Sequence, residues 1–370
     1  MGAFTAKCLF KELGLDSVFA KIYNPSPSNS QNQNIMKNVG IIGGSGFAGE
    51  ELIRYLSVRE DTSILAVSSR ELRGKRTSEI VENTELFFVD PEDDIFFDCD
   101  VVFFATPHGV SMNRANSFLE KNIKVIDLSA DFRLKDSKIW RDWYKSEHKD
   151  LDNLSSSIYG LTELNSELIK TSNLVAVPGC YPSASILGLM PLMKLDNNIE
   201  SITIDAKSGI SGAGRSRVES GLKEYIEENF YAYATSGHRH LPEISQILEE
   251  IYGEPLALNF LPHLIPAMRG IYATMYVNFT KLPEQNILEI YKNFYKDSPN
   301  IILMDIDQVP ETAKVAFTNK CQIGVYPSAI SNQLVIISSI DNLVKGAAGQ
   351  AIECYNLMCG HNQMKGLTNG

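Results

Sequence analysis

In the first half of the chain, the apolar residues occur in short continuous runs that are separated by segments with helical periodicity. Five runs are predicted to form strands buried on both faces, and they cover 39–42, 64–67, 100–105, 124–128 and 174–177. Helices are predicted at 50–56, directly after a glycine-rich loop, and at about 110–121. Short apolar strands that alternate with helices indicate a buried parallel sheet.

Beyond residue 180 the predicted strands become longer, and fewer helices separate them. Strands are predicted at 199–206, 271–279, 301–305, 321–325 and 333–339, and helices at about 242–252 and 284–295. Runs of strands with few crossovers are typical of a mixed or antiparallel α+β domain. The last apolar segment, 346–358, is rich in Ala, Gly and Leu and is predicted to form a closely packed helix.

Length and composition narrow the class of protein. A chain of 370 residues is too long for one comfortable core and suits two domains of ordinary size. Its 44% hydrophobic and 21% charged residues are typical of a soluble globular protein. The formal net charge of −11 argues against a nucleic acid or an anionic membrane as the main partner, but it allows a local basic pocket for a phosphorylated small molecule. No apolar run is long enough to span a bilayer.

The cysteines and the first residues bear on the compartment. The six cysteines are scattered without a CxxC pair, which is typical of reduced thiols in the cytosol and offers no zinc ribbon or disulfide framework. Residues 1–35 become rich in Pro, Ser, Asn and Gln at 25–34, a composition that cannot bury a core. A disordered extension or an upstream start is favoured over a transit peptide, because the segment lacks Arg and contains Glu12 and Asp16. We expect a cytoplasmic protein.

A glycine-rich loop follows the first predicted strand and precedes the first helix. Gly43, Gly46 and Gly49 form a GxxGxxG pattern there. Glycine lets the backbone turn sharply and approach a pyrophosphate, whose charge is favoured by the free N–H groups of a helix N-terminus. Because glycines also simply make turns, the pattern alone is weak. Its position between a strand and a helix favours a dinucleotide site.

The end of the second strand indicates which nicotinamide cofactor to expect. NAD-binding versions of this unit carry an acidic residue there, about 20 residues after the glycines. This chain instead has Ser68, Ser69 and Arg70, with Arg73 and Lys75 close behind. Two hydroxyls and a guanidinium suit a ribose 2′-phosphate. We therefore expect NADP, and the alternative is a solvated charged loop.

Cys180 lies in the segment 177–182 (VPGCYP), where a strand is followed by an apolar helical pattern. The free N–H groups and the dipole of a helix N-terminus stabilise a thiolate, so the pKa of Cys180 is expected to fall below the free value of about 8.5. Pro182 is favourable in the first turn of such a helix. A buried structural cysteine is the alternative. The other five cysteines have no comparable setting, and we interpret them as structural.

Two of the six histidines, His238 and His240, stand at the start of a predicted helix, with Glu243 in its first turn. A histidine that is oriented by a carboxylate can act as the general acid/base that a cysteine nucleophile needs. A metal site formed by these three residues is the alternative, but no further ligand pattern supports it. We interpret His148 and His361 as surface residues.

Two further segments combine hydroxyl or small side chains with a terminal arginine. One is 127–133, which follows a strand and ends in Arg133, and the other is 208–215, which ends in Arg215. Either could be an ordinary polar loop. Beside a cysteine and a dinucleotide site, they indicate a substrate that carries phosphate and carboxylate groups.

From about Lys37 to Met358, the sequence resembles the N-acetyl-gamma-glutamyl-phosphate reductase family of the aspartate-semialdehyde dehydrogenase superfamily. The motifs that carry the resemblance are GGSGFAGEEL at 43–52, TPHG at 106–109, DLSADFR at 127–133, YGLTE at 159–163, PGCYPS at 178–183, SGISGAGR at 208–215, GHRHLPEI at 237–244, HLIPAMRGI at 263–271 and DNLVKGAAGQA at 341–351. Nine motifs in the family's order are more specific than any single pattern.

The resemblance implies a role for residues in most of these motifs. The nucleophile is Cys180, and the acid/base is one of His238 and His240, of which we choose His240 because Glu243 follows it by one helical turn. The cofactor is expected to contact Gly43, Ser45, Gly46, Phe47, Ala48, Gly49, Ser68, Ser69, Arg70, Thr106, Pro107, His108 and Asn342, the last on the nicotinamide side. The substrate is expected to contact Arg133, Ser208, Ser211, Gly212, Arg215, His238, Glu243 and Arg269, with Arg133 on the phosphate. No metal is expected.

The resemblance also implies a fold and an activity. A Rossmann-type NADP-binding domain, 36–179, would be completed by a C-terminal helix at 341–358. An α+β domain with a mixed sheet, 180–340, would carry the substrate and the interface of a homodimer or homotetramer. The implied reaction is the NADPH-dependent reduction of N-acetyl-L-glutamyl 5-phosphate to N-acetyl-L-glutamate 5-semialdehyde, with release of phosphate through a Cys180 thioester, as a step of arginine biosynthesis.

Two alternatives remain beside this reading. Aspartate-semialdehyde dehydrogenase shares the cysteine and histidine chemistry but acts on a shorter substrate. A cofactor-independent Cys–His acyltransferase or hydrolase would have no use for the glycine loop or for the segment 68–70.

Overall fold

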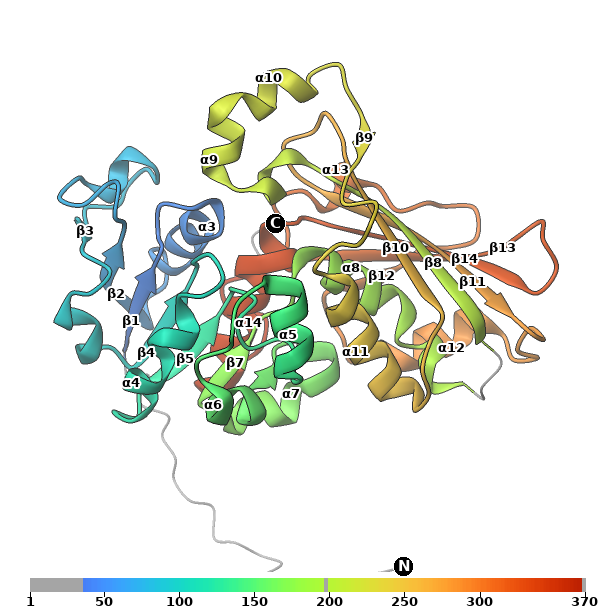
Figure 1. The fold of residues 1–370 in the computed structure, drawn as a ribbon, viewed down its shortest axis with the longest axis horizontal. Helices are drawn as coiled ribbons and strands as arrows, with labels where there is room; N and C mark the ends of the chain where they lie inside the picture. Colours follow the sequence, from blue (N-terminus) through green and yellow to red (C-terminus); the bar gives the residue numbers. More distant parts are fainter. Residues whose placement is uncertain (1–35, 196–198, 368–370) are drawn as a thin grey trace, which may run out of the picture. The chain divides into compact units, whose positions relative to one another are not determined.

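The structure is a computed structural model that describes residues 36–195 and 199–367, so the expected extension at 1–35 lies outside the described residues. Within these residues the strands form two seven-stranded sheets, which Figure 1 shows side by side. No helix in this part of the chain is both long and apolar enough to cross a membrane.

The first sheet is parallel throughout and has the order β3-β2-β1-β4-β5-β7-β6. Its strands are β1 (Lys37–Ile42), β2 (Thr62–Ser68), β3 (Phe88–Val89), β4 (Val101–Phe104), β5 (Lys124–Asp127), β6 (Ile158–Tyr159) and β7 (Leu174–Ala176). Because all strands run the same way, the glycine loop after β1 and the loops after β4, β5 and β7 meet at one edge of the sheet. This arrangement confirms the predicted parallel sheet.

Helices cover both faces of the first sheet, which explains why its central strands are apolar without alternation. In β4, Val101 and Phe103 pack into one core cluster and Phe104 into the other. The first cluster lies under helices α3 (Phe47–Leu56), α7 (Thr162–Thr171) and α14 (Gly349–Met358). The second lies under α4 (Ala115–Leu119), α5 (Ser137–Tyr144) and α6 (Leu151–Ser156). Helix α14 thus returns from the C-terminal end of the chain to the first sheet.

The second sheet is mixed and has the order β12-β13-β14-β11-β8-β10-β9. Its strands are β8 (Ile199–Ser208), β9 (Tyr231–Ala232), β10 (Leu258–Leu264), β11 (Ile271–Phe279), β12 (Ile301–Leu303), β13 (Cys321–Pro327) and β14 (Gln333–Ile340). Strand β11 is antiparallel to β8 and β14, whereas β10 runs parallel to β8. The predicted mixed sheet is confirmed.

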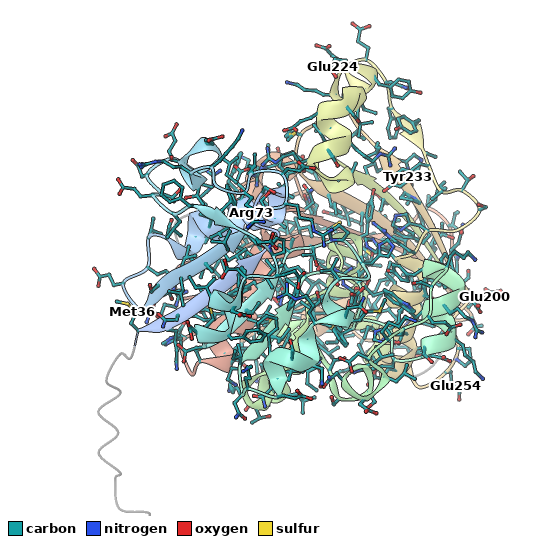
Figure 2. The ribbon with its side chains drawn as sticks, turned by 60° about the vertical axis from the view of Figure 1, so that its left-hand side comes forward. Met36, Arg73, Glu200, Glu224, Tyr233 and Glu254 are labelled. Carbon is teal, nitrogen blue, oxygen red and sulfur yellow. The ribbon has the colours of Figure 1, made fainter. Side chains whose placement is uncertain are left out.

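Helix α8 (Cys180–Leu189) packs against one face of the second sheet and is buried almost all round. It covers the alternate residues Ala273, Met275 and Val277 of β11, which belong to the same core. A helix that is apolar on every side must lie inside the protein. Helices α11 (Leu241–Tyr252) and α12 (Ile287–Phe294) add to this layer. The short helices α9 (Arg215–Arg217) and α10 (Lys223–Ile226) belong to a segment that stands out from the sheet, with Glu224 at its outer end (Figure 2), and α13 (Thr312–Val315) precedes β13.

Several local predictions need correction. Strand β10 was not predicted, because Asn259, Pro262 and His263 interrupt its apolar residues. The helix expected at 110–121 is a 3-10 turn followed by the short α4, and the C-terminal helix begins with a π-helical turn, Val344–Ala348. His148 is buried rather than on the surface, since it packs edge-on against Phe132 and Trp140.

Two carboxylates are buried together at the carboxyl edge of the first sheet. Asp127 accepts hydrogen bonds from the backbone N–H (2.9 Å) and the hydroxyl (2.9 Å) of Ser129. Asp131 accepts from the backbone N–H of Gly109 (2.7 Å) and from the Ser111 hydroxyl (3.0 Å). Burial, and next the charge of Asp131, raise the pKa of Asp127 to about 7. The pair therefore joins the loop after β4 to the loop after β5, and the pKa of one of its two carboxyl groups, that of Asp127, is raised as a result.

A raised carboxyl pKa predicts how stability depends on pH. Between the ordinary value near 4 and the folded value near 7, the folded state holds a proton that the unfolded state has lost, so Asp127 makes the protein less stable as pH rises through this window. Asp127→Asn removes this titration. We expect the free energy of unfolding of the variant, relative to the wild type, to rise by a few kcal/mol from pH 4 to pH 7.5. Urea titrations at a series of pH values measure the difference, and a constant difference would contradict the assignment.

Candidate active site

A cavity of about 450 Å³ lies at the carboxyl edge of the first sheet and is also lined by residues that follow β8 and β14. We call it the active-site cavity. The predicted site residues that line it are Gly46, Phe47, Ala48, Thr106, Pro107, His108, Arg133, Cys180, Ser211, Gly212, Arg215, His240 and Asn342. The remaining predicted residues lie outside the lining: Gly43, Ser45, Gly49, Ser68, Ser69, Arg70, Ser208, His238, Glu243 and Arg269.

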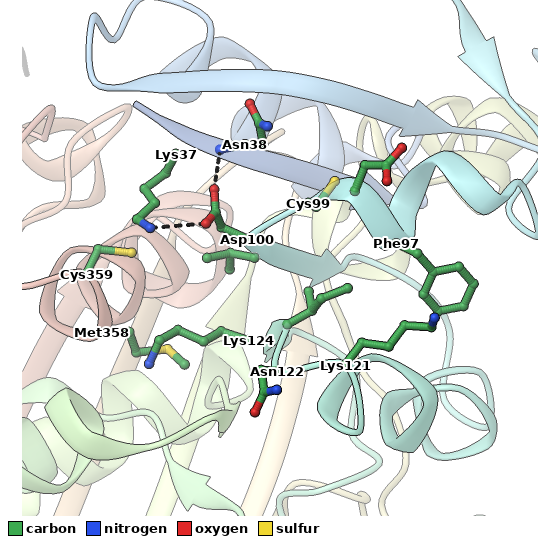
Figure 3. A pocket seen from close by; sticks show the side chains of 13 residues that line it. Lys37, Asn38, Phe97, Cys99, Asp100, Lys121, Asn122, Lys124, Met358 and Cys359 are labelled. Carbon is green, nitrogen blue, oxygen red and sulfur yellow. Dashed lines mark hydrogen bonds and ion pairs between the residues drawn. The ribbon is translucent and has the colours of Figure 1, made fainter. Parts of the chain in front are cut away.

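A larger cavity, of about 620 Å³, lies at the opposite edge of the first sheet, and Figure 3 shows Lys37, Asp100 and Lys124 around it. It contains two cysteines, but burial raises the pKa of Cys99 to about 12 and that of Cys359 to about 11, so both stay protonated. Ligands of parallel α/β sheets bind at the carboxyl ends of the strands. The smaller cavity is therefore the candidate active site.

The glycine loop is fixed by close backbone approaches that no side chain would allow. Gly43 has φ +89°, and a methyl group on its Cα would lie 2.5 Å from the carbonyl oxygen of Ala105. A methyl group on Gly49 would collide with the backbone of Gly43. The loop is joined to the end of β2, because the Gly43 N–H donates to the Ser68 hydroxyl (3.2 Å). These contacts leave the start of α3 open toward the cavity, as a phosphate-binding loop requires.

The three predicted cofactor residues at the end of β2 differ in how far they are exposed. Ser68 and Ser69 are buried, and the Ser69 hydroxyl lies 2.8 Å from the hydroxyl of Ser45 in the glycine loop. Arg70 is exposed. Arg73, three residues later, pairs with Asp90 at 2.6 Å.

Cys180 begins helix α8, as predicted, and its side chain faces the cavity. The expectation of a lowered pKa is wrong. Burial raises the pKa of the Cys180 thiol, and the opposing effects of Arg133 and of the N–H groups of Tyr181 and Cys180 do not reverse the shift. The helix N-terminus does favour the thiolate, but desolvation is the larger effect. The free site therefore holds a thiol.

His240 is directed at the residue before the cysteine. A methyl group on Gly179 would lie 2.6 Å from Nε2 of His240 and 2.9 Å from Nη1 of Arg133, so the imidazole and the guanidinium converge beside Cys180. Burial holds the pKa of His240 well below its usual range, and the charges of His238, Arg133 and Arg239 lower it further. The ring is neutral, and a neutral imidazole can accept a proton.

His238 is placed behind His240 rather than in the cavity. Its Nδ1 accepts a hydrogen bond from the backbone N–H of His240 (3.1 Å), and its ring packs edge-on against Tyr181 and Tyr233. Burial lowers the pKa of His238 to about 4. These contacts make it a support for the ring of His240.

Glu243 does not orient His240, contrary to the prediction. Its carboxylate accepts hydrogen bonds from the backbone N–H of Gly179 (2.8 Å) and from the Tyr159 hydroxyl (2.8 Å), and it lies 3.5 Å from Nη1 of Arg133. Within the described residues, Nδ1 of His240 has no hydrogen-bond partner. Glu243 therefore lies next to the cavity, where it faces the loop that carries the cysteine.

Arg133 is locked by the backbone of the first sheet. Its Nε donates to the carbonyl of Val177 (2.7 Å) and its Nη2 to that of Leu128 (2.7 Å). Burial opposes the charge of Arg133, but Glu243 more than offsets this effect and raises its pKa, so the guanidinium stays charged. A rigid cation thus faces the cavity beside Cys180.

The other predicted polar residues divide between the cavity and its surroundings. Asn342 donates to the hydroxyl of Ser211 (2.8 Å), and both line the cavity. Arg215 donates to the carbonyl of Ser45 (2.8 Å), pairs with Glu50 and lies over the ring of Phe47. It therefore joins the loop after β8 to the glycine loop.

Arg269 and Ser208 lie behind the cavity wall. Arg269 is held by Glu51 and by Asp341 (3.3 Å), and its guanidinium lies over the ring of Phe317. The Ser208 hydroxyl donates to the adjacent carbonyl of Gly209 (2.9 Å). Both residues shape the loops that carry Ser211 and Asn342.

The sequence analysis did not predict every residue of the cavity lining, and three of the missed residues bear on the chemistry. Arg239, Gly346 and Ala347 line the cavity, although each lies inside a motif that had been recognised. Gly346 packs directly against Cys180, since a methyl group on its Cα would lie 2.9 Å from Cβ of Cys180. Its small size was therefore the feature of the sequence that could have identified it. Across residues 36–195 and 199–367, no group of three or more His, Cys, Asp or Glu side chains is placed to hold a metal ion.

Comparisons with known proteins agree with this geometry. The family model described as the NAD binding domain of semialdehyde dehydrogenase matches residues 38–172, and the one described as its dimerisation domain matches 180–342. The folds of aspartate semialdehyde dehydrogenase II from Vibrio cholerae, in complex with ASA, and of the enzyme from Candida albicans with NADP are similar. Their TM-scores are 0.69 and 0.63 at 18% and 17% identity, over 88% of this chain and 98% of each of those chains.

Similarity in sequence is much higher to one group of enzymes. The N-acetyl-gamma-glutamyl-phosphate reductases of Ruthia magnifica and Nitrosospira multiformis are 44% and 42% identical over 337 and 339 residues, which is 90% of this chain and 98% of each relative. That of Acinetobacter baumannii is 43% identical over 343 residues, with the same coverage. This chain belongs to the N-acetyl-gamma-glutamyl-phosphate reductase family of the semialdehyde dehydrogenases.

Proposed function

We infer that the chain catalyses the NADPH-dependent reduction of N-acetyl-L-glutamyl 5-phosphate to N-acetyl-L-glutamate 5-semialdehyde, with release of phosphate. One observation carries this proposal. A cysteine at a helix N-terminus, a neutral histidine and a rigid arginine line the same cavity as the glycine-rich loop. The family relationship supplies the substrate, and the cavity supplies groups that suit each step of the chemistry.

The glycine loop fits a dinucleotide. A side chain at Gly43 or Gly49 would collide with the backbone of the loop, so only glycine allows the tight turn there. Helix α3, which follows this turn, presents its N-terminal N–H groups to a pyrophosphate. We propose that Gly46, Phe47 and Ala48 hold the pyrophosphate, and that the nicotinamide lies near Asn342, Thr106, Pro107 and His108. When bound, NADPH supplies the hydride that reduces the thioester.

We propose Arg70 as the residue that selects NADP over NAD. Ser68 and Ser69 are buried and engaged with the glycine loop, so they shape the ribose site more than they contact it. Arg70 follows them on the surface, and its guanidinium can bind a 2′-phosphate through two hydrogen bonds.

The proposed mechanism begins with a proton transfer. Because the Cys180 thiol and the His240 ring are both neutral at rest, His240 can take the thiol proton as the sulfur attacks the acyl carbon. The bond from the acyl carbon to the phosphate oxygen breaks, phosphate leaves beside Arg133, and a thioester forms on Cys180. After reduction, the hemithioacetal oxyanion becomes the aldehyde carbonyl as the carbon–sulfur bond breaks, and His240 returns its proton to the departing sulfur, so that the Cys180 thiol and the neutral imidazole are restored.

The charge of the cavity supports the acetylated substrate. Among the described residues that line it there are three arginines but no Asp or Glu. An aspartyl substrate has a free ammonium group, which would lie unpaired among cations. The N-acetyl compound replaces this group by a neutral amide while keeping its phosphate and its α-carboxylate. We therefore favour N-acetylglutamyl phosphate over aspartyl phosphate.

We also propose that the chain works as a homodimer or homotetramer. The match of residues 180–342 to a dimerisation domain supports association of copies through this part of the chain. Tyr272 and Tyr276, alternate residues of β11 on the face away from α8, are partly exposed, and we assign them to this contact between copies.

Replacement of the nucleophile tests the proposed mechanism. Cys180→Ser should lose nearly all phosphate-dependent NADP reduction while keeping its affinity for NADPH, because a serine hydroxyl is a much weaker acid than a thiol and the glycine loop is untouched. Cys359→Ser serves as the control and should keep its activity, because Cys359 is the other partly exposed cysteine among the described residues. Substantial turnover by Cys180→Ser would rule out the thioester.

The identity of the substrate can be tested with the two semialdehydes. We expect kcat/KM for the phosphate-dependent oxidation of N-acetyl-L-glutamate 5-semialdehyde to exceed that for L-aspartate 4-semialdehyde by more than about 100-fold. One methylene alone gives roughly 10- to 200-fold selectivity, and an unpaired ammonium adds to it. Equal or better use of the aspartate compound would refute the substrate assignment but leave the cysteine mechanism intact.

Cofactor selection is tested at Arg70. Arg70→Ala should weaken NADPH binding by a few kcal/mol at most, the scale of a charge-assisted contact, and leave NADH binding nearly unchanged. Arg73→Ala is the matched control, since Arg73 is a nearby exposed arginine already paired with Asp90. Fluorescence titrations measure both affinities, and an equal loss for NADPH and NADH would show that Arg70 does not read the 2′-phosphate.

A further inference from the structure

Three arginines line the active-site cavity, and they differ in how their charges are compensated. Arg133 faces Glu243 and donates to two backbone carbonyls of the first sheet. Arg215 pairs with Glu50 and lies over the ring of Phe47. Both guanidiniums are therefore committed to protein partners before a substrate enters.

Arg239 is the exception. It is exposed, it lines the cavity, and within residues 36–195 and 199–367 it makes no ion pair or hydrogen bond through its side chain. Because the described lining contains no Asp or Glu, Arg239 is also the source of uncompensated positive charge there. Such a cation, beside the catalytic groups, suits an anionic group of a bound molecule.

The turn that carries Arg239 explains why it is free. The rings of His238 and His240, on either side, pack inward against Tyr181. Before them, Gly237 has φ +132° and approaches the ring of Trp143 so closely that a methyl group on its Cα would lie 3.0 Å away. With both neighbours turned inward, the side chain of Arg239 is left at the cavity, next to the proposed acid/base.

The substrate under the proposed function has two anionic groups. The phosphate leaves in the first step, and Arg133 lies beside the cysteine where this happens. The α-carboxylate stays through acylation, reduction and release, so it needs a cation that takes no part in the chemistry. Arg133 faces the leaving phosphate and Arg215 pairs with Glu50, whereas the guanidinium of Arg239 is free to form a bidentate pair with the carboxylate.

We propose that Arg239 binds the α-carboxylate of the N-acetylated amino-acid substrate and selects for it. The proposal rests on the proposed function. Arg239 is then a specificity residue of the same cavity. Arg133 serves the leaving phosphate, and Arg239 holds the carboxylate at the other end of the substrate.

The test compares two aldehydes that differ only in the carboxylate. N-acetyl-L-glutamate 5-semialdehyde carries it, and 4-acetamidobutanal is the same molecule without it. In phosphate-dependent oxidation, the wild-type enzyme should prefer the carboxylated aldehyde in kcat/KM by roughly 10- to 150-fold, the range expected for a hydrogen-bonded ion pair. Arg239→Ala should lose most of this preference, through a raised KM for the carboxylated aldehyde and little change for the other.

Two further variants make the result specific. Arg239→Lys keeps the charge without the bidentate geometry and should restore part of the preference. Arg217→Ala removes an exposed arginine outside the cavity and should keep all of it. NADPH affinity, measured by titration, should be unchanged in every variant and shows that each one is folded.

The possible outcomes are distinct. Full preference in Arg239→Ala would overturn the proposal, and so would an equal fall in kcat/KM for both aldehydes, because that result would mean that Arg239 acts on His240 and not on the carboxylate. A wild-type enzyme that does not oxidise N-acetyl-L-glutamate 5-semialdehyde at all would instead contradict the proposed function, and this proposal with it.

Discussion

The geometry of the active-site cavity depends on one buried carboxylate, that of Glu243. It belongs to helix α11, which packs with the second sheet, yet its hydrogen bonds go to Gly179 and Tyr159 and its charge faces Arg133. A buried carboxylate without partners would be costly, so these contacts hold α11 against the loops of the first sheet. His240 precedes α11 and Cys180 follows Gly179. One residue therefore sets the position of the cysteine relative to the histidine, although it contacts neither side chain.

A second buried charge, that of Lys345, supports the part of the cavity wall that carries Gly346. Lys345 lies 2.6 Å from carboxylate oxygens of both Glu163 and Glu353, and these acids keep it charged by outweighing the effect of burial on its pKa. The π-helical turn Val344–Ala348 directs Lys345 into the interior, while the next residue, Gly346, packs against Cys180. This explains the motif YGLTE, to which no role had been assigned, and the lysine of the motif DNLVKGAAGQA. They form one ion cluster that supports the nucleophile from behind.

Features that depend on the local pattern of residues, such as the buried strands and the position of Cys180, were predicted from the sequence. Strand β4 was visible because its residues are buried on both faces, and Cys180 was recognised from the strand and the apolar helix on either side of it. What failed depends on contacts between distant residues. Glu243 bonds to a residue 64 positions away, and the pKa of Cys180 follows from burial by elements that no local pattern reveals. Arg239 was overlooked because a lone arginine beside two histidines shows its importance only once its neighbours' partners are known.

The electrostatics of the cavity give a reason for the neutral resting state of the pair. The charge of Arg133 favours a thiolate at Cys180 but opposes a protonated ring at His240, so it cannot stabilise the ion pair of the two. Burial disfavours both ions as well. An acyl phosphate changes this balance, because its negative charge against Arg133 weakens the repulsion that the imidazolium would meet. On the proposed mechanism, the proton therefore moves from sulfur to imidazole only when the substrate is in place, and a cysteine that is inert in the free enzyme becomes a nucleophile in the complex.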